Sequence, residues 1–134
     1  MIVDFQGNSH YFSSPQYFFN ELSSDCAYEI GVQTICLKLK PEAKMPKYLI
    51  WMLQTNLIDR CTTNPYRAVS YFTLETFKSE FVVNFPTVTF HPLERINTSP
   101  SFEFKNLFGH KILEISDVII RVNIRKRCLD SQSL

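Results

Sequence analysis

The side chains whose type and spacing suggest chemistry in this chain are cations, and the chemistry they suggest is phosphate binding. Lys38 and Lys40 alternate with apolar residues, so both should project from one face of an extended strand. Lysine and arginine neutralise nucleic-acid phosphates, and asparagine or arginine can also reach base edges. We predict that this surface contains Lys38, Lys40, Lys44, Lys47, Arg60, Asn64, Tyr66 and Arg67. The alternative for each residue is an ordinary solvated side chain.

A second cationic cluster lies near the C-terminal end of the chain and consists of Arg121, Arg125, Lys126 and Arg127. Such a run can bind nucleic acid or an anionic membrane surface. It can equally protect the edge of a sheet or keep a terminus soluble. The sequence does not place the two clusters on a common face.

Patterns typical of catalysis and metal binding are absent from the sequence. The histidines and cysteines are scattered, and no two cysteines form the close pair typical of zinc sites. Asp4, Asp25, Asp59 and Asp117 form no spaced pair of the kind that general acid–base catalysis uses. We therefore predict no enzymatic activity, no metal site, no cofactor and no small-molecule substrate.

Length and composition indicate one globular domain over residues 1–134. The apolar content of 45% is ordinary, and the formal charge of +1 gives no overall attraction to nucleic acid or anionic membrane. No signal peptide and no apolar run of membrane-spanning length is visible, so we expect a soluble cytoplasmic protein with reduced cysteines.

The strand that carries the first two lysines should lead into one main helix. Apolar and polar residues alternate from Ile35 to Lys40, which predicts a strand with one buried face. Pro46 suits the first turn of a helix, and apolar residues follow it at helical spacing. We predict a helix over about residues 46–60, with the Asn64–Pro65 pair marking its end.

The remaining elements should complete an α+β domain with a single mixed or antiparallel sheet. We predict further strands at 2–5, 81–85 and 101–105, and one or two strands within 111–126. Short helices are expected at 16–22 and from Thr73 onward. Gly31 should mark a bulge or a close approach of another segment.

The middle of the chain, about residues 28–86, resembles the C-terminal half of a target-recognition domain from the specificity subunits of type I restriction–modification systems. That family joins an L-x-L-K-like strand to a P-x-Y-L helix, a polar loop, an L-x-x-F/L turn and a short strand ending in proline. The matching segments here are 37–41, 46–49, 53–54, 74–78 and 82–86.

The resemblance implies a DNA-binding module without activity of its own. Its partners would be double-stranded DNA and a separate methyltransferase or nuclease subunit. A second hypothesis comes from the low glycine content, the abundant phenylalanine and the basic C-terminal strand. These features also suit a small structural or assembly protein, such as a viral matrix-like protein, that self-associates and contacts membrane or nucleocapsid.

Overall fold

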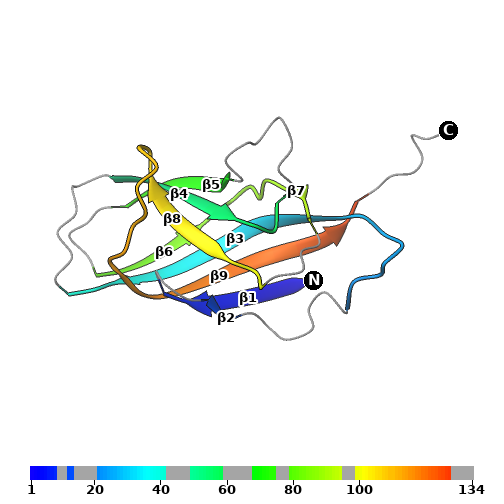
Figure 1. Cartoon of the computed structure of the whole chain (residues 1–134), viewed down its shortest axis with the longest axis horizontal. Helices are drawn as coiled ribbons and strands as arrows, with labels where there is room; N and C mark the ends of the chain where they lie inside the picture. Colours follow the sequence, from blue (N-terminus) through cyan, green and yellow to red (C-terminus); the bar gives the residue numbers. More distant parts are fainter. Residues whose placement is uncertain are drawn as a thin grey trace.

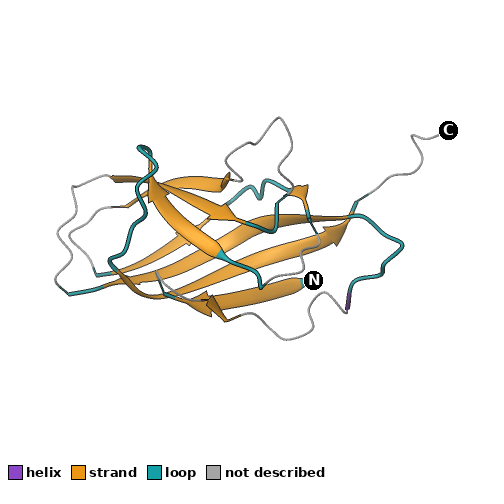
Figure 2. Cartoon of the chain, viewed as in Figure 1, coloured by secondary structure: helices purple, strands orange, loops and turns teal. Residues whose placement is uncertain are grey.

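The chain folds into two antiparallel β-sheets that face each other across one apolar core (Figure 1). The computed structural model describes residues 1–8, 12–13, 21–41, 49–58, 68–74, 79–94 and 99–127. No α-helix occurs in these residues, and Figure 2 shows strands joined by loops, apart from a short 3₁₀ segment at Glu21. The predicted α+β fold with one main helix is therefore wrong, and the fold is a β-sandwich.

The larger sheet is built around two long central strands. β3 (Tyr28–Leu39) pairs with β9 (Ile115–Lys126), and β1 (Ile2–Gly7) lies on the other side of β9. The short strand β2 (Phe12–Ser13) continues beyond β1, while β6 (Glu80–Asn84) and β7 (His91–Pro92) both pair with the free side of β3.

The smaller sheet has three strands, with β4 (Leu49–Thr55) between β5 (Ala68–Leu74) and β8 (Phe102–Asn106). It lies over the larger sheet, with β4 and β8 in front of β3 and β9 in Figure 1. Thr55 ends β4 by donating a hydrogen bond to the Ser101 carbonyl and accepting one from the Leu57 amide. These two hydrogen bonds satisfy the buried Thr55 hydroxyl at the end of the strand.

The core lies between the sheets and follows from period-two alternation on the strands. Side chains that are 0% exposed come from both layers, namely Phe5, Ile35, Trp51, Leu53, Leu57, Ile115, Ile120 and Val122. A bulge in β3 between Val32 and Thr34 inserts one extra residue, so Val32 and Ile35 both face the core. The predicted buried face of residues 35–39 is confirmed.

The predicted helix over 46–60 is replaced in its described part by β4 and the turn that follows it. Trp51 and Leu53 point into the core, and Met52 on the opposite face of the strand is only 8% exposed. Ile50 and Met52 on one face of β4 are apolar, as are Trp51 and Leu53 on the other, so the sequence lacks a period of two and imitates the stripe of a buried helix. The short helix expected from Thr73 is also wrong at its start, because Thr73 lies within β5. Most of the helix predicted at 16–22 lies outside the described residues.

A five-residue excursion interrupts the edge of the larger sheet between β6 and β7. The Phe85 amide donates to the Gln33 carbonyl, pairing with β3 resumes at His91, and residues 86–90 between them fold over Gly31. A Cβ added at Gly31 would meet the Val88 side chain and would lie 2.8 Å from the Thr89 carbonyl oxygen. The predicted close approach at this glycine is confirmed, and the absence of a side chain is what permits it.

Candidate functional site

One group of exposed apolar residues lies on the outer face of the larger sheet, which we define as the face turned away from the core. Ile119, Cys36 and Val82 lie side by side across β9, β3 and β6. Val82 is 66% exposed and Ile119 is 39% exposed, while Cys36 is half-buried between them. We call these three residues the apolar row, and it ends at the outermost strand, β6.

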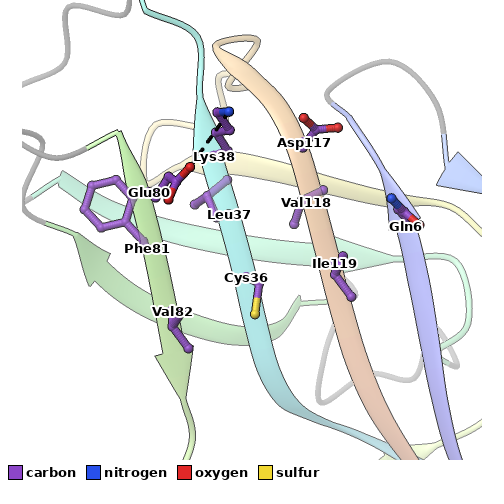
Figure 3. A pocket seen from close by; sticks show the side chains of 10 residues that line it. All are labelled: Gln6, Cys36, Leu37, Lys38, Glu80, Phe81, Val82, Asp117, Val118 and Ile119. Carbon is purple, nitrogen blue, oxygen red and sulfur yellow. Dashed lines mark ion pairs between the residues drawn. The ribbon is translucent and has the colours of Figure 1, made fainter.

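A shallow groove of about 450 Å³ runs along this row (Figure 3). Gln6 on β1 closes one end, and Phe81 and Val82 on β6 line the other. Lys38 and Asp117 form part of the rim at the end of the strands. Most of the solvent-accessible lining is apolar, so the groove favours contact with apolar groups.

Rows of oppositely charged side chains flank the apolar row. On one side Lys38 Nζ lies 3.8 Å from Glu80 Oε1. On the other side Arg121 donates two hydrogen bonds to the Asp4 carboxylate, at 2.8 and 3.0 Å. Each pair joins neighbouring strands, so the outer face carries both signs of charge in alternation rather than a single sign.

The Asp4–Arg121 pair also shifts the titration of both groups. The hydrogen bonds from Arg121 hold the pKa of the Asp4 carboxyl below its usual value, and burial opposes this only in part. In turn the hydrogen bonds to Asp4 raise the pKa of Arg121. Both side chains are about half exposed, so solvent screens the pair and its contribution to stability is small.

The sequence-predicted DNA-binding residues are only partly within the described structure. Lys38 projects from the outer face as predicted, but its ammonium group is paired with Glu80. Lys40 follows the end of β3, where its amide donates to the Glu114 carbonyl. The other six predicted residues lie outside the described part of the chain, and these are Lys44, Lys47, Arg60, Asn64, Tyr66 and Arg67.

The second predicted cluster divides between the sheet and its end. Arg121 and Arg125 lie on the outer face of the larger sheet together with Lys38. Members of both cationic clusters therefore lie on one face, which could not be predicted from the sequence. Arg125 is paired with Glu29 at 3.1 Å and lies over the Phe90 ring, 3.6 Å from its centre. Lys126 and Arg127 are exposed at the end of β9.

The acidic partners of these cations were missed because they are remote in sequence. Asp4 precedes Arg121 by 117 residues and Glu29 precedes Arg125 by 96. Antiparallel pairing of β9 with β1 and β3 places each carboxylate directly opposite its cation. A pattern of charges along one segment cannot reveal such cross-strand pairs.

A second cavity of about 320 Å³ lies between β5 and the edge formed by residues 85–91. Ser70 Oγ and His91 Nε2 line it without a hydrogen-bond partner among the described residues. No carboxylate is among its described lining residues, so a serine–histidine–carboxylate arrangement is not formed by them. Within the same residues, no three histidine, cysteine, aspartate or glutamate side chains are grouped as metal ligands.

No family model, curated protein or solved structure matches this chain. The resemblance to target-recognition domains remains a prediction, although the helix on which part of it relied is a strand here. Among the residues whose structure is described, no helix is long and apolar enough to cross a membrane.

Proposed function

We propose that this chain is a non-enzymatic assembly protein that associates with further copies of itself through its larger sheet. The observation that carries the proposal is the apolar row, which crosses three strands and ends at the sheet edge on Val82. Exposed apolar residues that are contiguous and rimmed by polar groups are typical of protein-interaction sites.

The charge distribution favours association of like copies. A formal charge of +1 produces little long-range repulsion between two identical chains. On the outer face the cations Lys38, Arg121 and Arg125 each have a carboxylate within 4 Å. Two such faces or edges can therefore approach without bringing together large areas of one sign.

Duplex DNA binding draws less support from the same residues. Phosphate contacts require cations that are free to displace the counterions condensed on the DNA. The three cations named above already face carboxylates. Lys126 and Arg127 are exposed at the end of β9. The prediction that these two residues contact an anionic partner therefore stays open to test.

The proposal is tested by measuring the molar mass of the purified protein over a wide concentration range. Sedimentation velocity and light scattering should show a mass that rises from monomer toward dimer or larger species. Because apolar contact drives the association, moderate salt should change it little. A monomer at every concentration would exclude self-association as the function.

A further inference from the structure

Among the residues that the structure describes, the outer edge of β6 has backbone groups with no partner strand at alternate residues. The Leu39 amide donates to the Ser79 carbonyl at 2.8 Å, and the Phe85 amide donates to the Gln33 carbonyl at 3.1 Å. In an antiparallel ladder the residues that face the neighbouring strand alternate with residues that face away. The N–H and C=O groups of Glu80, Val82 and Asn84 therefore point away from β3.

This edge carries few of the features that usually prevent strand addition. In the part of the chain that the structure describes, β6 has a neighbouring strand on one side only. Its sequence is Glu80-Phe81-Val82-Val83-Asn84, which contains no lysine or proline and has three consecutive residues of high β propensity. Exposed edges of this kind are templates for pairing with another chain.

We propose that β6 pairs antiparallel with β6 of a second copy, around a two-fold axis that is perpendicular to the sheet and passes midway between the two Val82 residues. The inference rests on the proposed self-association and specifies its contact. Val82 then lies opposite Val82 of the second copy, and Glu80 lies opposite Asn84 of the second copy. The backbone groups that point away from β3 form the new ladder.

Four observations select this register. It aligns all five residues of β6, whereas a shift in either direction leaves outward backbone groups unpaired. Asn84 Oδ1 already accepts a hydrogen bond from Thr34 Oγ1 at 3.2 Å, which turns the Asn84 amide N–H groups toward other acceptors. The Glu80 side chain is 73% exposed and supplies such an acceptor across the axis. Pro86 lacks an amide donor and ends the ladder beyond Asn84.

The pairing joins the two larger sheets into one continuous sheet. Because the axis is perpendicular to the sheet, both outer faces lie on the same side. The apolar rows of the two copies then meet end to end, with the two Val82 side chains at the centre and Cys36 and Ile119 following on each side. This places the most exposed residue of the row in contact with an identical side chain.

The register is tested with a cysteine and a lysine at the same position. Directly opposite residues in an antiparallel pair have Cα atoms about 5 Å apart, which suits a disulfide. Cys36 on β3 lies directly opposite position 82 and could capture a new thiol. In a Cys36→Ser background, mild oxidation of Val82→Cys should therefore give a dimer linked between the introduced thiols, as located by peptide mapping. Tyr71→Cys, on the exposed edge strand β5, is the matched control and should not form a homologous link.

Val82→Lys should weaken self-association at least about tenfold, because it places two ammonium groups against each other across the axis. Thr73→Lys on β5 should associate like the wild type, and the exposure of both positions should leave folding unchanged by circular dichroism. If Val82→Lys associates normally and Val82→Cys gives no link, the register is wrong while self-association stands. If the wild type is monomeric throughout, both proposals fail.

Discussion

Replacing Gly31 by alanine tests the packing of the 86–90 excursion against the larger sheet. The new methyl group would meet the Val88 side chain, lie 2.8 Å from the Thr89 carbonyl oxygen and lie 3.4 Å from Phe90 Cδ1. A side chain can rotate, but a backbone carbonyl cannot move without its segment. The excursion must therefore lift away from β3.

The expected cost combines three effects. Overpacking of a tight contact costs about 1–3 kcal/mol. Lifting Phe90 from the Arg125 guanidinium removes a cation–π contact, which costs about 0.5–1 kcal/mol more. Alanine also restricts the unfolded chain and returns roughly 0.4–1 kcal/mol in favour of folding. The free energy of unfolding should thus fall by roughly 1–3 kcal/mol in total.

Urea unfolding measures this change, with the fluorescence of the single tryptophan, Trp51, reporting on the core. With a denaturant slope of about 1–3 kcal/mol per molar, the midpoint should fall by on the order of 1 M. Val88→Ala removes one of the clashing groups, so the double variant Gly31→Ala/Val88→Ala should lose less stability than the sum of the single variants. Wild-type stability of Gly31→Ala would show that the excursion does not pack as described.

Three further predictions concern charge, core and partner. Because the pKa of Asp4 is lower in the folded than in the unfolded protein, its ion pair stabilises the fold at pH values above the unfolded-state pKa, and this stabilisation is lost as the pH falls through the folded-state pKa. Asp4→Asn should therefore cost under about 1 kcal/mol at neutral pH and nothing in strong acid. Midpoints of urea unfolding measure both values. Leu53→Ala should cost about 2–5 kcal/mol and Ile50→Ala far less, by thermal unfolding, since only Leu53 is fully buried. Labelled duplex DNA should show no steeply salt-dependent binding by anisotropy; if it does, and Lys38→Glu/Lys40→Glu abolishes it, the DNA-binding hypothesis is preferred.

Strands with one buried and one exposed face were predictable from the sequence. At residues 35–39, 81–85 and 120–124, apolar residues occupy every second position, which predicts a strand and identifies the face that turns toward the core. An amphipathic helix has a period of 3.6 residues and does not produce this pattern. β4 was not predictable by the same rule. With Met52 buried on one face and Trp51 and Leu53 on the other, its sequence has no alternation to detect.

The candidate surface was predictable only in part. The outward direction of Lys38 follows from the alternation of its strand. Its pairing with Glu80 depends on the register between β3 and β6, which the intervening chain does not specify. The apolar row was missed for the same reason, because Ile119, Cys36 and Val82 become neighbours only when three distant strands are aligned.

The position of β9 between β1 and β3 has a consequence for how the chain folds during synthesis. The strand that occupies the middle of the larger sheet is the last strand described in the sequence, so β1 and β3 have no common neighbour until residues 115–126 have emerged from the ribosome. Topologies dominated by such long-range pairing fold slowly, in roughly milliseconds to seconds. Until then β1 and β3 expose apolar faces and open edges, and a nascent chain of this protein is open to capture by chaperones or by other nascent copies.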